Sequence, residues 1–246
     1  MPDLLIDNDG AVRILTMNRP EKRNALNMAL SEALLGGLRE VDRDASIRAI
    51  VLTGAGPGFC AGADLSEFAE LQSTKETMVR RRAELTMELH GAFAKLTKPV
   101  VTAINGAAMG GGAGLALAGD IAVMSETARI GYPEVKHGIV AAVVMANLVR
   151  QAGRKAAFEL VGTGQAIDAA RALALGLVNR VVAPGELMET ALQFAKAMAD
   201  VEPQAMAATK NLFYRVADLP FDEALEAGRE VNQRMRSFGR DKWPTP

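Results

Sequence analysis

The sequence predicts a mixed α/β fold built around a mostly parallel sheet. Through the first two-thirds of the 246 residues, short runs of β-branched residues alternate with stretches whose apolar residues have helical spacing. Such alternation is typical of strands joined by helical crossovers, which leave neighbouring strands parallel. After about Pro184 the strand signal ends and a run of helices is expected.

The expected elements follow in order from the N-terminus. Strands over 4–6 and 12–17 flank Asp9-Gly10, a dipeptide that favours a hairpin turn. Asn27 is placed to open a helix whose apolar residues recur at helical spacing from 28 to 41. Four further strands are expected over Ile47–Thr53, Val100–Ile104, Asp120–Met124 and Val178–Val182.

The C-terminal part of the chain is expected to be helical. Three helices are predicted, over Glu186–Ala199, Gln204–Arg215 and Phe221–Arg236. A helical tail of this kind cannot cover all its apolar surface alone, so it packs on the body or on a neighbouring subunit. We therefore expect a core over 1–185 and a helical C-terminal oligomerisation region over 186–246.

The charge balance gives no support for nucleic-acid or membrane binding. The formal net charge is −1, and no basic run is interleaved with aromatic residues. The one local basic run, Arg80-Arg81-Arg82, has acidic neighbours on the same predicted helix, which favours a solvated helix face. Neither a nucleic acid nor a membrane is therefore expected as a partner.

Three features favour a cytoplasmic protein. Cys60 is the only cysteine, which excludes an internal disulfide and fits a reducing compartment. The N-terminal segment carries Asp3, Asp7 and Asp9 and lacks the basic-then-apolar order of a signal peptide. The longest strongly apolar stretch, 139–149, is shorter than the roughly 18 residues of a membrane span.

Two glycine-rich turns are the most informative feature of the chain. They lie over Ala61–Leu65 and Met109–Gly114, and each follows a strand-like run and leads into a helix-like stretch. Glycine permits close approach and positive φ, and the start of a helix leaves unpaired N–H donors in a field that favours negative charge. Two such turns can point N–H groups at one spot, which is how an oxyanion hole is built.

Three carboxylates follow these turns or lie near them. Asp64 is placed to cap the helix after the first turn, and Asp120 ends the helix after the second, where structural hydrogen bonding is expected. Glu134 differs because it follows Pro133 in an apolar setting. Such surroundings raise the pKa of a carboxyl group, which suits a proton shuttle.

Other chemistries lack the residues that they need. The only histidines are His90 and His137, and no G-x-S-x-G elbow is present, so a Ser-His-Asp hydrolase is not supported. Two isolated histidines and one cysteine offer no metal-ligand spacing. The loop over 53–58 lacks the G-x-G-x-x-G spacing of a dinucleotide site. We expect no metal, and we expect His90 to have a packing or surface role on its helix, among apolar neighbours, rather than a catalytic one.

Several motifs together resemble a known family in order and spacing. They are Asn18–Leu26, Phe59–Leu65, Ala103–Gly106 with Gly110–Gly112 and Gly119-Asp120, and Pro133-Glu134. They are similar to the motifs of the enoyl-CoA hydratase/isomerase (crotonase) superfamily, and the similarity runs from about residue 4 to residue 236.

The resemblance implies a crotonase-like superhelix of stacked ββα units, with helical C-terminal regions used in trimers that often pair into hexamers. It implies an acyl-CoA or enoyl-CoA thioester as substrate and a place in fatty-acid metabolism. The thioester carbonyl oxygen would accept hydrogen bonds from the backbone N–H groups of Ala63 and Gly111. Coenzyme A is then part of the substrate, and no separate cofactor is expected.

The resemblance also implies a path for the coenzyme. Ala25, Ala61, Asp64 and Leu65 would line the adenine and pantetheine path, and Arg23 is a candidate phosphate contact.

Two side chains near Glu134 are further candidates for substrate binding. Tyr132 either faces the acyl pocket or fills its wall. His137 follows Glu134 by three residues, which places it on the same side of a helical turn, or it is a loop histidine bound to backbone. Phe238 and Lys242 are candidates to reach a neighbouring subunit's coenzyme.

One departure from the family's pattern affects the expected reaction. The hydratases of the family carry a glutamate two residues after the glycine triplet, where this chain has Gly114. Glu134 then remains as the single acid/base carboxylate, which favours double-bond isomerisation over hydration. A hydratase-like lyase, a thioester hydrolase or decarboxylase of the same fold, and a non-catalytic acyl-CoA-binding protein stay open as alternatives. The acyl group depends on the stretch over 66–92.

Overall fold

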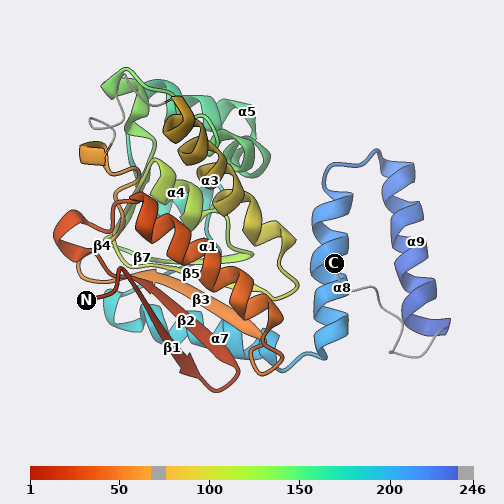
Figure 1. Cartoon of the computed structure of the whole chain (residues 1–246). Coiled ribbons are helices and arrows are strands. Elements are labelled where there is room, and N and C mark those ends of the chain that lie inside the picture. Colours follow the sequence, from red (N-terminus) through yellow and green to blue (C-terminus); the bar gives the residue numbers. More distant parts are fainter. Residues whose placement is uncertain (68–75, 238–246) are drawn as a thin grey trace.

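The computed structural model describes residues 1–67 and 76–237, and two sheets form its centre (Figure 1). The larger sheet has the order β1 (Leu4–Asp9), β2 (Val12–Met17), β3 (Ala49–Gly54), β5 (Val100–Ile104), β7 (Ile121–Ser125) and β10 (Arg180–Val182). Within the larger sheet as described, β1 and β2 are the antiparallel pair, and they are joined by a turn in which Gly10 has φ of +60°. The other pairs in this sheet are parallel, which confirms the sequence prediction.

A second sheet of short strands lies beside the first. Its order is β4 (Gly58–Cys60), β6 (Ala107–Met109), β8 (Arg129–Gly131) and β9 (Ile167–Asp168). Strands of two or three residues carry no measurable periodicity, so the sequence did not predict this sheet. Each consecutive pair, β3 and β4, β5 and β6, and β7 and β8, gives one strand to each sheet. The chain therefore advances as the expected spiral of ββα units.

Helices and short helical turns connect and cover the strands. They are η1 (Pro20–Lys22), α1 (Met28–Arg43), α3 (Glu76–Lys95), α4 (Gly111–Ala116), η2 (Pro133–His137), α5 (Met145–Thr163), α6 (Ala169–Ala174), η3 (Pro184–Glu186), α7 (Leu187–Ala199), α8 (Pro203–Val216) and α9 (Phe221–Ser237). Asn27 caps α1 as predicted, because its side chain accepts a hydrogen bond from the Leu30 N–H at 2.8 Å. Among the described residues, no helix is both long and apolar enough to cross a bilayer.

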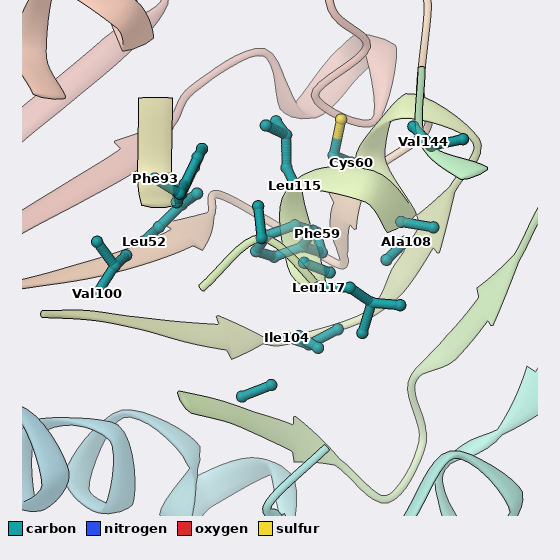
Figure 2. Close-up of a cluster of buried hydrophobic side chains, with 14 of the residues drawn as sticks. Leu52, Phe59, Cys60, Phe93, Val100, Ile104, Ala108, Leu115, Leu117 and Val144 are labelled. Carbon is teal, nitrogen blue, oxygen red and sulfur yellow. The ribbon is translucent and has the colours of Figure 1, made fainter. Parts of the chain in front are cut away.

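The main core lies between the sheets and the helices α1, α3 and α4. Figure 2 shows Phe59 of β4, Ile104 of β5 and Leu115 of α4 meeting in this core, where all three are fully buried. Cys60 lies in the same cluster, and its burial raises the pKa of the thiol to about 12. The thiol therefore behaves as a small apolar side chain rather than as a nucleophile.

The three C-terminal helices do not behave alike. Helix α7 packs on the larger sheet, with Ala191 and Ala195 buried against residues of β3 and β5. Helices α8 and α9 form a hairpin beside the body (Figure 1). The boundary expected at residue 185 and the role of 186–246 in oligomerisation stay predictions.

Asp120 anchors α8 to the body. Its Oδ2 accepts hydrogen bonds from Lys210 Nζ at 2.7 Å and from the Val100 N–H at 2.7 Å. Its Oδ1 accepts one from the Tyr214 hydroxyl at 2.9 Å. This agrees with the structural role that the sequence predicted for Asp120.

Candidate active site

Backbone hydrogen bonds join the first glycine-rich turn to the segment after η1. The Ala61 N–H donates to the Arg23 carbonyl oxygen at 2.9 Å, and the Leu26 N–H donates to the Gly62 oxygen at 2.7 Å. The Asp64 N–H then donates back to the Leu26 oxygen at 3.0 Å. Two of the motifs that carry the resemblance are therefore neighbours in space.

The second turn lies directly against the first. A Cβ built on Gly62, whose φ is +89°, would lie 2.6 Å from the Met109 carbonyl oxygen and 3.3 Å from the Gly111 nitrogen. A Cβ on Gly111 would lie 4.0 Å from the Ala63 nitrogen. Only glycine at position 62 combines this backbone conformation with so close an approach.

Ala63 and Gly111 line one cavity, and the N–H group of each is free of a protein acceptor in the described part of the chain. Gly111 is the first residue of α4, where a helix leaves its N–H without an intrahelical partner. The structure therefore brings the two residues together, and their role as donors stays a prediction.

The cavity has a volume of about 580 Å³, the size of a small-molecule site. Its walls come from α3, from the segment after η2 and from the two turns. The lining side chains are mainly apolar, and the polar ones are Ser31, Arg82, Thr86, His90 and Glu134. The contribution of α3 agrees with the expectation that 66–92 shapes the pocket.

Glu134 lies on η2 and faces the second turn. A Cβ on Gly110, whose φ is +53°, would lie 2.7 Å from Glu134 Oε1. Glu134 Oε2 is buried and has no hydrogen-bond partner among the described residues. Burial raises the pKa of this carboxyl group, as its apolar setting predicted. Such a group can exchange protons with a ligand in the cavity.

The space beside Gly114 is already filled. A Cβ at this position would lie 2.3 Å from Val144 Cγ1 and 2.8 Å from both Cδ2 and Nε2 of His90. No second carboxylate can therefore extend from residue 114 unless these side chains move.

His90 was expected to pack or to lie at the surface, and in the structure it lines the cavity. Its Nδ1 lies 2.8 Å from the Thr86 carbonyl oxygen, and its Nε2 lies 3.0 Å from the Gly111 carbonyl oxygen. The side chain is buried, and burial lowers the pKa of the imidazole. Nothing in the sequence near His90 signals contact with a turn that follows it by about twenty positions.

Asp64 stabilises the first turn through an ion pair and hydrogen bonds. Its carboxylate pairs with Arg19 Nη2 at 2.9 Å and accepts hydrogen bonds from the Ser66 hydroxyl at 2.6 Å and N–H at 3.1 Å. The Ser66 hydroxyl and then Arg19 lower the pKa of this carboxyl group. Residues 65–67 are helical, as the capping interpretation predicted.

Residues that sequence reasoning missed support the site. Arg19 also donates to the Ala25 oxygen at 2.5 Å. Asn24 is fully buried and donates to the oxygens of Ala55 and Gly58, both at 2.9 Å. Asn105 donates to the Gly54 oxygen at 2.9 Å. The signal was present, because all three residues lie inside the motifs that carry the resemblance.

Arg82 corrects the interpretation of the basic run as a solvated face. Arg80 and Arg81 are exposed and pair with Glu76 and Glu32. Arg82 is buried, contacts Glu67 and donates to the Leu26 carbonyl oxygen at 2.6 Å. The three arginines do not share one solvated face, because successive residues of a helix point in different directions.

The residues expected along the coenzyme path lie on the joined segments rather than in the cavity. Arg23, Ala61 and Leu65 are exposed there. Ala25 and Asp64 are buried, and Arg19 binds the carbonyl oxygen of the first and the carboxylate of the second.

The remaining candidates do not line the cavity. Tyr132 is fully buried, and its hydroxyl has no partner in the described part of the chain. His137 is exposed, although its charge lowers the pKa of Glu134 against the larger effect of burial. Phe238 and Lys242 lie outside the described residues. In residues 1–67 and 76–237, no group of acidic, His and Cys side chains could hold a metal ion.

The fold is that of the crotonase superfamily. A crystal structure of an enoyl-CoA hydratase from Mycobacterium smegmatis superposes with a TM-score of 0.91 at 32% identity, over 96% of this chain and 93% of that one.

The sequence comparisons give the family. Residues 7–240 match the family model for enoyl-CoA hydratase/isomerase, and the chain belongs to that family. The 2,3-dehydroadipyl-CoA hydratase of Escherichia coli is 37% identical over 94% of this chain and 89% of its own length. The short-chain-enoyl-CoA hydratase of Clostridium acetobutylicum is 36% identical over 91% of this chain and 85% of its own length.

Proposed function

We propose that this enzyme stabilises the enolate of a CoA thioester. The observation that carries the proposal is that Ala63 and Gly111, whose N–H groups have no acceptor among the described residues, line one cavity together with Glu134. The thioester carbonyl oxygen accepts from both donors, and negative charge grows on it when Glu134 removes a proton from the acyl chain. One such donor is worth about 3 kcal/mol in the transition state.

The single carboxylate favours double-bond isomerisation. Glu134 removes a proton from one carbon, the electrons shift into the enolate, and the same carboxyl group returns the proton to another carbon. No water enters and no atom is gained. Support for this reaction comes from Gly114, because His90 and Val144 occupy the space that a second carboxylate would need.

Hydration is the second candidate, and the names of the relatives favour it. Water would add to the double bond, and Glu134 would then have to place the water or deliver the proton to the enolate carbon. Either reaction uses the same oxyanion donors, so the two candidates differ only in how protons and water are handled.

For the coenzyme, we propose a path along the joined segments that carry Ala63. Arg23 and Leu65 are exposed and can contact the phosphates and the pantetheine. The buried side chain of Asp64 supports this path by holding the turn, and Ala25 and Ala61 border it. Coenzyme A enters as part of the substrate, and no other cofactor is needed.

A trimer or hexamer fits the surface of the C-terminal hairpin. Phe213 on α8 is 64% exposed and Phe221 on α9 is 76% exposed, far more than a monomer usually leaves for large aromatic residues. Light scattering of the full chain at micromolar concentration measures the assembly. A stable monomer would contradict this part of the proposal.

The test of function uses calorimetry and a substrate panel. We expect saturable binding of a non-reactive acyl-CoA, and turnover of a 3-enoyl-CoA to a 2-enoyl-CoA that exceeds water addition to the 2-enoyl-CoA. Faster hydration would favour the second candidate. Binding without turnover of any thioester would identify an acyl-CoA-binding protein, and no binding at all would refute the proposal.

A further inference from the structure

His90 connects two elements that build the cavity. It lies on α3, is 6% exposed, and borders the cavity with Ala63, Gly111 and Glu134. The contact between its Nε2 and the Gly111 carbonyl oxygen, at 3.0 Å, bridges α3 to the first residue of α4. Gly111 is the residue whose N–H faces the proposed thioester oxygen.

The second turn needs such a contact because it is intrinsically flexible. Gly110, Gly111 and Gly112 follow one another, and glycine has wider conformational freedom than any other residue. An oxyanion donor works only when its direction is fixed before the reaction. A hydrogen bond to the Gly111 carbonyl oxygen ties the peptide between Gly111 and Gly112 to α3. Because Gly111 already has helical conformation at the start of α4, this also limits rotation of the preceding peptide, which carries the Gly111 N–H.

The missing side chain at position 114 makes this contact sterically accessible. His90 Nε2 and Cδ2 lie 2.8 Å from the place that a Cβ of residue 114 would take, which is closer than real Cβ contacts. A side chain at 114 and the imidazole in its present position exclude one another. Position 114 and the imidazole of His90 therefore compete for the same space.

We propose that His90 is a positioning residue for the oxyanion hole: its Nε2–H donates to the Gly111 carbonyl oxygen and fixes the direction of the Gly111 N–H. The inference rests on the proposed function for its effect on catalysis, but the hydrogen bond itself does not. Both ring nitrogens face carbonyl oxygens, and a neutral imidazole carries one proton. The position of that proton therefore decides whether His90 donates to the Gly111 oxygen or to the Thr86 oxygen.

The first experiment locates the proton without any substrate. The chain has only two histidines, so nitrogen-15 NMR of the free protein gives two ring systems, and a His137→Asn variant assigns them. We expect His90 to carry a proton on Nε2, either as that neutral tautomer or as the imidazolium. A proton on Nδ1 alone would overturn the proposal, because a lone pair would then face the Gly111 oxygen.

The second experiment separates positioning from packing. His90→Phe keeps a ring in the space but has no donor, whereas His90→Gln keeps an N–H donor near the Nε2 position. We expect His90→Phe to lower kcat by about 10–100-fold with the Kd for a non-reactive acyl-CoA nearly unchanged, and His90→Gln to recover a large part of the loss. Unchanged kcat in His90→Phe, or equal loss in both variants, would refute the positioning role.

The two experiments distinguish the failure of this inference from the failure of the proposed function. A wild-type protein that turns over no thioester, with the proton on Nε2, refutes the function and leaves the hydrogen bond established. Should His90→Phe fail to fold, the proton position and the His90→Gln variant still decide the inference.

Discussion

Adding a single methyl group at position 114 tests whether the cavity wall can accept a side chain there. In Gly114→Ala the new Cβ would lie 2.3 Å from Val144 Cγ1 and 2.8 Å from two atoms of His90. Gly36 provides a matched control, because it lies inside α1 and a Cβ there meets nothing within 4 Å.

Gly36→Ala and Gly114→Ala share one effect on the free energy of unfolding and differ in a second. Replacing glycine by alanine inside a helix stabilises it by about 0.5–1 kcal/mol, and this applies at both sites. Forcing an extra carbon into a packed interior costs about 1–3 kcal/mol, and this applies only at position 114. We therefore expect Gly36→Ala to raise the free energy of unfolding and Gly114→Ala to fall about 1–3 kcal/mol below that control.

Urea unfolding of the three proteins measures the difference. A Gly114→Ala Val144→Ala double variant removes the closest contact, so the cost of the alanine at 114 should be smaller in the Val144→Ala background. Equal stabilisation by Gly114→Ala and Gly36→Ala would refute the account of a filled wall. The same reasoning predicts that Gly114→Glu loses stability and gains no hydratase activity.

Other predictions concern the charged groups. Glu134→Gln lowers turnover by about 10²–10⁴-fold while calorimetry finds thioester binding retained; unchanged turnover would exclude Glu134 as the proton carrier. Because burial raises the pKa of Glu134, the carboxyl group destabilises the native state as pH rises through that pKa. Glu134→Gln should therefore raise the melting temperature near neutral pH but not below the ordinary glutamate range, and the reverse order would contradict the pKa shift. Arg19→Met leaves the buried Asp64 carboxylate unpaired and should cost about 3–5 kcal/mol in urea unfolding, whereas no loss would show that the pair is dispensable. Lys210→Met removes a donor from Asp120, so hydrogen exchange in α8 should accelerate relative to α1; unchanged exchange would exclude this anchor.

The local features of the fold could be predicted from the sequence. The Asp9-Gly10 hairpin, the Asn27 cap and the four further strands depend on neighbouring residues, and each appears within one or two residues of its predicted bounds. The close approach of the two glycine-rich turns was also predictable, because residues without a side chain permit it.

What the sequence could not give depends on contacts between distant segments. Arg82 differs from Arg81 only in the direction that its side chain takes from α3, yet one is buried in the cavity wall and the other is exposed. The His90 side chain fits beside the second turn because residue 114 has no side chain. Tyr132 is fully buried because other elements cover it. Single-residue patterns carry none of this information.

The central claim is that the N–H of Gly111 binds the thioester carbonyl, and two substitutions at that position isolate this group. A Cβ on Gly111 meets Leu26 Cδ1 at 3.4 Å, an ordinary contact, so Gly111→Ala adds a carbon and keeps the N–H. Gly111→Pro adds the same carbon and removes the N–H at the first helical position, where proline is tolerated.

Infrared difference spectroscopy of a bound acyl-CoA with a carbon-13 thioester carbonyl gives the most direct measurement. The account predicts a lower carbonyl stretching frequency in the wild type and in Gly111→Ala than in water, and a frequency much nearer the water value in Gly111→Pro. A frequency equal to that in water for all three bound complexes would contradict it.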